Sequence, residues 1–295
     1  MSEKKIPESE LILNEDGSIY HLKLKPDDVA DNIIVVGDPK RVAAVSKFFD
    51  RIELERENRE LVTHTGWLNG KRITAMSTGM GPDNIDIVIN ELDAIVNIDL
   101  TERKVRKDLR KLNIIRLGTS GALQGDIDPG SFVASTHGLG IDGVLNFYRV
   151  DEGVFSEDIA SAFTRHMRWP ASLARPYVAP GSEKLLKLVA EDFIHGITAT
   201  APGFFGPQGR ELRLPLSFSN INEKMESFRF GEHRICNFEM ETSALYGLGR
   251  LMGHEMLTVC VIIANRVSKK FCKDYKPFME DRKSTRLNSS HVSES

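Results

Sequence analysis

The segment from Asn113 to Ala122, NIIRLGTSGA, constrains the fold more than any other part of the chain. It places Arg116 inside a short β-branched run, and two glycines and two hydroxyl groups follow. Such runs are typical of buried strands that end in a tight loop. A buried guanidinium needs a partner, because an unpaired buried charge is very costly. Two interpretations remain open: Arg116 binds a phosphate or carboxylate ligand beside the glycine-rich loop, or it forms a structural pair with a carboxylate of the protein.

Composition excludes several classes of protein. The chain has 295 residues, of which 41% are hydrophobic, and this suits one large α/β domain with a sizeable core. The net charge of −3 does not favour a general nucleic-acid binder. The N-terminus has no apolar signal core, and the longest apolar run, residues 259–264, is too short to cross a membrane. We therefore expect neither nucleic acid nor a membrane as a partner.

The cysteines Cys236, Cys260 and Cys272 are odd in number and widely spaced. This pattern fits neither a disulfide framework nor a zinc site. Cys236 and Cys260 lie in apolar segments, so we expect them to be inert core residues. The sequence predicts a cytoplasmic protein of a reducing compartment, without a metal site.

Strand-like and helix-like segments alternate along the chain, with no linker between two halves. The predicted strands are residues 32–36, 59–67, 72–77, 114–117, 130–135, 196–201, 235–238 and 258–264, with a short edge segment at 21–24. The predicted helices are residues 38–49, 82–95, 101–111, 181–192 and 242–252. We expect residues 1–20 to be a loose lead-in, 136–148 a glycine-rich connection and 150–175 an irregular segment. This order predicts a single α/β domain with a mixed sheet.

The segment GDPKR follows the first predicted strand directly. Asp38 suits an N-cap and Pro39 the first helical position, so Arg41 is expected in the first turn of a helix. The N–H groups and the dipole attract anions at such a helix start, and Arg41 adds a full charge. The alternative is a solvated arginine on a helix surface.

Glu239 and Glu241 flank Met240 at a predicted junction between a strand and a helix. Ligands of open α/β sheets bind at such junctions. A carboxylate at this position can accept hydrogen bonds from sugar hydroxyls. The alternative is that both glutamates cap the N-terminus of the helix.

The loop of residues 202–210, PGFFGPQGR, is too rich in glycine and proline to be regular. Phe204, Phe205, Gln208 and Arg210 bring two rings, an amide and a guanidinium into one loop, a combination suited to a recognition pocket. The alternative is a surface loop that its phenylalanines pin down.

The last residues, 281–295, read DRKSTRLNSSHVSES and carry no apolar periodicity. Residues 281–291 resemble the in-frame translation of a common DNA-sequencing adapter. We therefore expect a non-native tail that replaces the natural C-terminus. The alternative is a genuine disordered polar tail.

Five segments in the same order and spacing resemble the nucleoside phosphorylase-I family, and most closely its uridine phosphorylases. They are GDPKRV at Gly37, NREL at Asn58, IRLGTSG at Ile115, GPQGR at Gly206 and FEMET at Phe238. The resemblance covers residues 21–280. It implies a mixed, distorted central β-sheet flanked by helices, and a homo-oligomer with a homodimer as its smallest unit, within a hexamer. It also implies phosphorolysis of a nucleoside, with inorganic phosphate as co-substrate and without a metal or organic cofactor.

The resemblance assigns roles residue by residue, with Arg116, Glu241 and Arg210 as the catalytic residues. The implied phosphate-binding residues are Gly37, Arg41, Arg116, Gly118 and Thr119, with Arg59 reaching over from a neighbouring subunit. The implied ribose-binding residues are Thr119, Glu239, Met240 and Glu241, with His21 lent by a neighbour. The implied base-binding residues are Phe204, Gln208, Arg210 and Arg266.

Some positions depart from the family pattern. Asp83 stands where a serine helps to bind potassium in some relatives, so we predict no potassium ion. Gly209 replaces a usual acidic residue, and residues 101–111 are an insertion. Purine-cleaving relatives use an aspartate near the end of the last strand, where this chain has Ile263-Ala264-Asn265-Arg266. We predict phosphorolysis of uridine to uracil and ribose 1-phosphate. The alternatives are a purine nucleoside phosphorylase or nucleosidase of the same family, and a nucleoside-binding relative that is not an enzyme.

Overall fold

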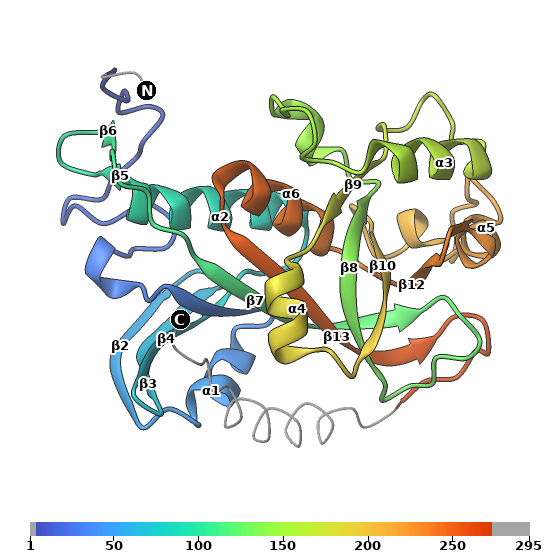
Figure 1. Ribbon diagram of the computed structural model, residues 1–295, viewed down its shortest axis with the longest axis horizontal. Helices are drawn as coiled ribbons and strands as arrows, with labels where there is room; N and C mark the ends of the chain where they lie inside the picture. Colours follow the sequence, from blue (N-terminus) through green and yellow to red (C-terminus); the bar gives the residue numbers. More distant parts are fainter. Residues whose placement is uncertain (1–3, 273–295) are drawn as a thin grey trace.

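The computed structural model describes residues 4–272 of the chain. These residues form a single α/β domain in which helices flank a central mixed sheet (Figure 1). This architecture confirms the predicted fold class. Among the described residues, no helix combines the length and the apolar character that crossing a membrane requires. The predicted adapter-like tail, residues 281–295, lies outside the described residues.

The described part of the sheet runs in the order β11-β12-β10-β8-β13-β7-β1-β4-β3-β2, and β9 pairs with β8. The strands are β1 (Asn32–Val36), β2 (Arg51–Asn58), β3 (Leu61–Leu68), β4 (Lys71–Ser77), β7 (Asn113–Ala122), β8 (Phe132–Gly140), β9 (Tyr177–Pro180), β10 (Ile194–Thr200), β11 (Arg229–Phe230), β12 (His233–Glu239) and β13 (Glu255–Asn265). A separate pair consists of β5 (Ile98–Asp99) and β6 (Lys104–Val105). The helices are α1 (Lys40–Ser46), α2 (Pro82–Asn97), α3 (Glu157–Met167), α4 (Glu183–Val189), α5 (Ile221–Ser227) and α6 (Thr242–Met252).

The C-terminal half of the sheet closes on itself. Strand β12 lies parallel to β10, and its residues Asn237 and Phe238 also pair antiparallel with the end of β7. The pairings of β7 with β13, β13 with β8 and β8 with β10 complete a closed ring of strands. Closure protects strand edges that would otherwise be exposed, and it explains the distortion that the resemblance implied.

The parallel strands β1 and β4 end together, beside the middle of β7. Val36 of β1 aligns with Ser77 of β4 and Leu117 of β7. Gly37 therefore follows the carboxyl end of β1, whereas Gly118, the next position of β7, lies inside its strand. Ligands of open α/β sheets bind at such carboxyl ends.

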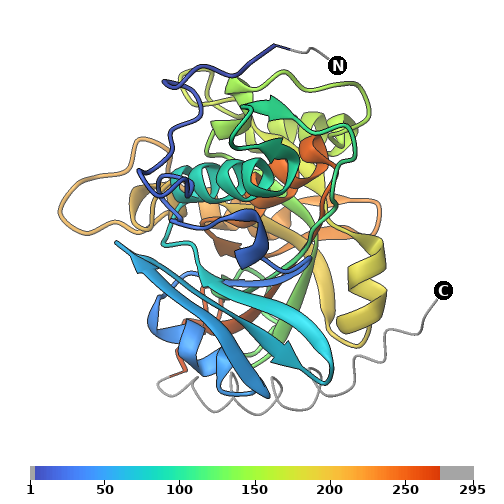
Figure 2. The same cartoon turned by 90° about the vertical axis from the view of Figure 1, so that its left-hand side faces the viewer.

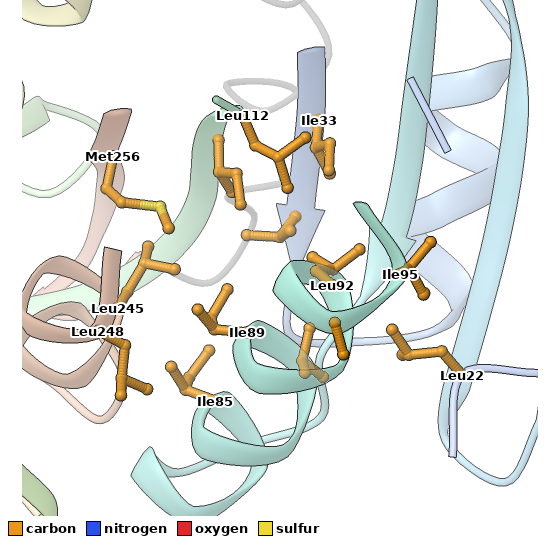
Figure 3. Close-up of a cluster of buried hydrophobic side chains, with 14 of the residues drawn as sticks. Leu22, Ile33, Ile85, Ile89, Leu92, Ile95, Leu112, Leu245, Leu248 and Met256 are labelled. Carbon is orange, nitrogen blue, oxygen red and sulfur yellow. The ribbon is translucent and has the colours of Figure 1, made fainter. Parts of the chain in front are cut away.

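Helices α2 and α6 lie side by side on one face of the sheet (Figure 1). Ile85, Ile89 and Leu92 repeat at helical spacing along α2, so they share one face of the helix. They meet Leu245 and Leu248 of α6 in a buried cluster (Figure 3). Each buried side chain of this kind contributes about 2 kcal/mol. The cluster fixes both helices, and thereby their N-terminal ends, against the sheet.

Helix α1 packs on the opposite face through Val42 and Val45, against strands β1 and β4. Next to it, β2, β3 and β4 form consecutive antiparallel pairs, in blue and cyan at the front of Figure 2. Asn69 and Gly70 join β3 to β4 with positive φ angles of 50° and 74°. The predicted Asn-Gly hairpin is therefore confirmed.

The prediction of a glycine-rich loop after residue 117 is wrong. Strand β7 continues through this segment to Ala122. Thr119 and Ser120 pair with Val261 and Ile262 of β13, so the glycines lie inside the ladder. Pairing with a distant strand overrides the local preference of glycine for turns.

Other local expectations are also wrong. Residues 101–111 contain turns and β6 instead of a helix, because Lys104 and Val105 pair with β5, and Asn97 accepts the Arg110 N–H at 2.7 Å. Strand β8 continues to Gly140 through part of the expected connection, and residues 150–175 contain α3. Residues 21–24 do not form a strand, since His21 and Leu22 lie in a turn and Lys23 and Leu24 have no regular structure. The lead-in is not loose throughout, because Leu11 and Ile19 are buried.

Candidate active site

Arg116 lies in the middle of β7 with its side chain buried. Its Nη2 forms an ion pair with Oε2 of Glu241, and its Nη1 lies 3.2 Å from Oε2 of Glu239. The structure thus supplies the acidic partners that a buried arginine requires. It brings together three of the predicted site residues from β7, β12 and the start of α6.

Backbone amides hold both carboxylates. Glu239 accepts hydrogen bonds from the amides of Glu241 and Thr242 at 2.9–3.0 Å, at the N-terminus of α6. Glu241 accepts one from the Gly81 amide at 2.8 Å, at the N-terminus of α2. The positive ends of two helices therefore stabilise these carboxylates. Glu239 has the capping geometry of the alternative interpretation, and Met240 between the glutamates is partly exposed.

The electrostatics of this cluster keep Arg116 protonated. Burial alone would lower the pKa of Arg116, but the charges of Glu241 and Glu239 outweigh it, and the pKa is raised. Burial raises the pKa of Glu241, against the opposing charge of Arg116. Removing one member of such a buried pair leaves an uncompensated charge, which is strongly destabilising.

Gly118 provides the space that the guanidinium of Arg116 occupies. A Cβ atom at Gly118 would lie only 2.2 Å from Nη1 of Arg116. The thiol of Cys260, on the paired strand β13, lies 3.5 Å from the same nitrogen. Burial raises the pKa of Cys260 to about 11, so the group stays a neutral thiol. Cys260 is buried as expected, yet it also contacts the arginine of the site.

Alternation along β7 separates two groups of predicted phosphate ligands. Arg116 and Gly118 face the side covered by α2 and α6. Thr119 shares its side with Leu117, which packs near α1, the helix that carries Arg41. Gly37 follows the end of β1. Except for Arg59, the predicted phosphate residues thus come from elements on both faces of the sheet.

The four predicted base-binding residues form one group. Nη1 of Arg210 donates to the Phe204 carbonyl at 2.5 Å and to Oε1 of Gln208 at 2.6 Å, and the guanidinium lies 3.7 Å from the centre of the Phe204 ring. Nη2 of Arg266 donates to the Gln208 carbonyl at 2.9 Å. Burial and, after it, repulsion by Arg266 lower the pKa of Arg210 to about 10, so Arg210 remains charged near neutral pH.

A pocket of about 770 Å³ opens beside this loop. Arg210 and Asp142 contribute polar groups to its wall, and Trp169, Phe205 and Phe218 contribute rings. Its size lies within the range of pockets that hold small molecules. Phe205 and Arg210 place the pocket next to the predicted base-binding residues.

His21 and Arg59 lie on a common surface. Nδ1 of His21 is 2.6 Å from Oε1 of Glu91 on α2, and the His21 carbonyl accepts a hydrogen bond from Asn58 at 2.8 Å. Arg59 follows Asn58 at the exposed tip between β2 and β3, with a φ of 56°. Within residues 4–272, Arg59 has no hydrogen bond or ion pair, and neither residue contacts the Arg116 cluster.

Reasoning from sequence missed the groups that hold the charged residues in place, among them Thr200, Gly81 and Cys260. Thr200 donates a hydrogen bond to Oε1 of Glu239 at 2.7 Å. These contacts join residues far apart in the chain, so no local motif signals them. Among the described residues, no group of three or more His, Cys, Asp or Glu side chains forms a metal site.

The chain is similar to known nucleoside phosphorylases. A family model, the phosphorylase superfamily, matches residues 31–291. The chain is 30% identical to a uridine phosphorylase of Thermococcus kodakarensis, over 88% of this chain and 82% of that protein. It is 27% identical to a DeoD-type purine nucleoside phosphorylase of Alkaliphilus metalliredigens, over 82% of this chain and 85% of that protein. A solved nucleoside phosphorylase of Trypanosoma brucei, described as showing uridine phosphorylase activity, superposes with a TM-score of 0.84 at 29% identity, over 95% of this chain and 98% of that structure.

Proposed function

Since the chain belongs to the phosphorylase superfamily and is an enzyme of the nucleoside phosphorylase type, we propose that it cleaves uridine with inorganic phosphate to give uracil and ribose 1-phosphate. One observation carries this proposal. Strand β7 holds a buried arginine that is kept charged between two carboxylates, and its last residue joins a separate group able to recognise a base, because the Arg266 amide donates to the Ala122 carbonyl at 2.9 Å. The cation serves phosphate, Glu241 serves the sugar, and Glu239 holds the cation.

Phosphate is proposed to bind where β1 ends beside the middle of β7. Gly37 allows close approach of the backbone, Gly118 makes room for the guanidinium of Arg116, and Thr119 adds a hydroxyl donor. Arg41 and Arg116 supply charge from the two faces of the sheet. Nε of Arg116 is buried and has no hydrogen-bond partner among the described residues, so it is a donor that an oxyanion can use. Phosphate is the proposed co-substrate, and, as the resemblance implies, the proposal includes no metal or organic cofactor.

The ribose is proposed to bind above the phosphate, against Met240 and the two glutamates. Glu241 accepts hydrogen bonds from the 2′- and 3′-hydroxyls, while Glu239 retains its contact with Arg116. Cleavage of the N-glycosidic bond passes through an oxocarbenium-like sugar. The protein positions phosphate below C1′ and stabilises negative charge on the departing base, and such preorganisation supplies most of the required barrier reduction.

The base is proposed to bind between Phe204 and the polar group of Gln208, Arg210 and Arg266. Oε1 of Gln208 already accepts from Arg210, but an amide oxygen has a second lone pair for the N3–H of uracil. The guanidiniums donate to the uracil carbonyls, where negative charge develops.

A purine nucleoside is the second candidate substrate, because a DeoD-type purine nucleoside phosphorylase also matches the chain. Protonation of a purine N7 needs an acid near the end of β13. Asn265 occupies this region, and its side-chain amide donates to the carbonyls of Gln124 and Ile127 at 2.8 Å. Its side-chain oxygen accepts the Val267 amide at 2.9 Å. Asn265 is thus committed to the local backbone, which favours uridine.

The active unit is proposed to be a dimer, within a hexamer, in the cytoplasm. Arg59 at an exposed tip and His21 beside it lie on one surface, from which a second copy can receive both. Within the described residues, neither side chain contacts the Arg116 cluster of its own chain. This separation supports the proposal that both residues act in the site of a neighbouring copy.

The decisive experiment measures release of free base from uridine, cytidine, inosine and adenosine, each with and without phosphate. The proposal expects uridine to be cleaved fastest and only when phosphate is present. Turnover without phosphate would identify a nucleosidase instead. Faster cleavage of inosine or adenosine would identify a purine enzyme.

A further inference from the structure

Thr200 belongs to one of two neighbouring side-chain pairs that link β10 to β12. Thr198 aligns with Asn237, and Thr200 aligns with Glu239. Each threonine donates its hydroxyl to its partner at 2.7 Å, and both threonines are fully buried. The two pairs differ in the further contact of the β12 residue: the Asn237 amide donates to Ser120, whereas Glu239 contacts Arg116.

The direction of the Thr200 hydroxyl proton is fixed. Its oxygen accepts the amide of Ser243, in the first turn of α6, at 2.9 Å. The hydroxyl has one hydrogen, which is therefore directed to Oε1 of Glu239. The start of α6 is itself held tightly against β8, because a Cβ atom at Gly138 would lie 2.8 Å from Cα of Ser243.

This contact is the one side-chain hydrogen bond among the donors that orient the Glu239 carboxylate in the described part of the chain. Oε1 accepts Thr200 and the Thr242 amide, whereas Oε2 accepts the Glu241 and Thr242 amides and faces Nη1 of Arg116. Without the hydroxyl, the carboxylate loses the side-chain donor that anchors Oε1. The carboxylate then rests on two backbone amides alone, and the partner of the guanidinium at Nη1 is held less firmly.

From this geometry we propose that Thr200 is a positioning residue for phosphate, acting through Glu239 on Arg116. The inference rests on the proposed reaction. There, Glu241 turns to the ribose hydroxyls, so Glu239 is the partner that keeps Arg116 in place for phosphate. Thr200 touches neither substrate, and its effect falls on phosphate more than on the nucleoside.

The test compares Thr200→Val, which removes the hydroxyl at similar volume, with Thr200→Ser, which keeps it. Thr198→Val is the matched control, because it removes an equally buried hydroxyl from the neighbouring pair, Thr198 and Asn237. Steady-state kinetics give KM for phosphate and for nucleoside separately, and thermal unfolding gives Tm for every variant. A hydrogen bond to a charged group corresponds to roughly a 10- to 100-fold effect.

We expect Thr200→Val to lower kcat/KM for phosphate by about 10-fold or more, with a smaller change in KM for the nucleoside. Thr200→Ser is expected to restore most of the loss, and Thr198→Val to lower Tm without raising KM for phosphate. An unchanged phosphate KM in Thr200→Val overturns the inference. An equal rise in Thr198→Val, or no rescue by serine, overturns it as well, because either result indicates a packing effect.

Two further measures keep the test informative. If Thr200→Val does not fold, Thr200→Cys serves in its place, since a thiol fills similar space and donates only weakly. The kinetics use whichever nucleoside the wild-type enzyme cleaves with phosphate, so an error in the uridine assignment does not affect the outcome. If no nucleoside is cleaved, the shift in Tm with added inorganic phosphate replaces KM: loss of the shift in Thr200→Val alone supports the inference, and an unchanged shift overturns it.

Discussion

Arg116 and Glu241, 125 residues apart in the chain, form a buried ion pair between β7 and the start of α6. In the proposed reaction the arginine serves phosphate and the glutamate serves ribose. The two substrates therefore meet at one pair of side chains. Ribose hydroxyls that engage Glu241 leave a terminal nitrogen of Arg116 available to phosphate, which ties the two binding sites together.

Gly118→Ala is expected to impair catalysis by displacing Arg116. The new Cβ atom would lie 2.2 Å from Nη1 of Arg116 and 3.0 Å from Sγ of Cys260, so the flexible guanidinium must move. A displacement of about 1 Å at a reacting group costs on the order of 10²-fold in rate. We expect kcat/KM for phosphate to fall by about this factor, measured by steady-state kinetics.

Gly125→Ala is the control for this prediction. Its Cβ atom would meet Cγ1 of Val267 at 3.8 Å, an ordinary contact. We expect near wild-type kinetics for Gly125→Ala. Wild-type phosphate kinetics in Gly118→Ala would contradict the view that Gly118 makes room for Arg116.

Mixing two inactive variants tests whether the active site is shared between subunits. Arg59→Ala removes a group that we expect a neighbour to supply, and Arg116→Ala removes the arginine of the receiving chain. A mixed dimer contains one site with both arginines intact, so activity should partly return after subunit exchange. Mass spectrometry or tagged copurification verifies the exchange. Verified exchange without recovered activity would place both arginines in the site of a single chain.

Much of the fold could be predicted from sequence because its signals are local. Strand β1 and helix α6 have the predicted bounds, since an apolar run and a helical repeat mark them clearly. Strand β7 runs past its predicted end, because pairing with β13 and β12 holds its glycines in the ladder. Helix α3 was missed although Ile159, Phe163 and Met167 are buried at helical spacing.

The residues of the candidate site were likewise only partly predictable from the sequence. The charged residues of the site stand in recognisable segments, so Arg116, Glu239 and Glu241 could be named in advance. Their supports could not be named, because Thr200 and Gly81 reach them only through strand register and helix placement. The role of Gly118 also differs from expectation, since it provides space for a side chain.

His137 is expected to make the protein sensitive to acid. Burial, followed by the charge of His233, lowers the pKa of His137 to about 4 from its ordinary value of 6.5, with Arg250 acting in the same direction and Asp158 opposing it. Between these two values the unfolded chain binds a proton that the folded chain does not. Stability is therefore expected to fall as the pH drops from 7 to 5, by on the order of 2 kcal/mol at most.

Urea unfolding at several pH values checks this prediction. The variant His137→Gln cannot bind the proton, so its stability should change less between pH 7 and pH 5 than that of the wild type. Equal losses in the two proteins would assign the acid sensitivity to other groups.

Base recognition by Gln208 and Arg210 gives the last prediction. Uracil presents an N3–H donor between two carbonyl acceptors, and Gln208 with Arg210 offers an acceptor beside donors. Cytosine has an amino donor in place of one carbonyl, so a guanidinium would face a donor. A buried mismatch of this kind costs on the order of 10⁴-fold in kcat/KM. We therefore expect uridine to be cleaved far faster than cytidine, and Gln208→Ala or Arg210→Ala to lose most of the uridine turnover.

Glu211→Ala, at the exposed neighbouring position, is the matched control and should retain turnover. The measurement is phosphate-dependent release of uracil and cytosine. Equal rates for the two nucleosides in the wild-type enzyme would remove Gln208 and Arg210 from base recognition.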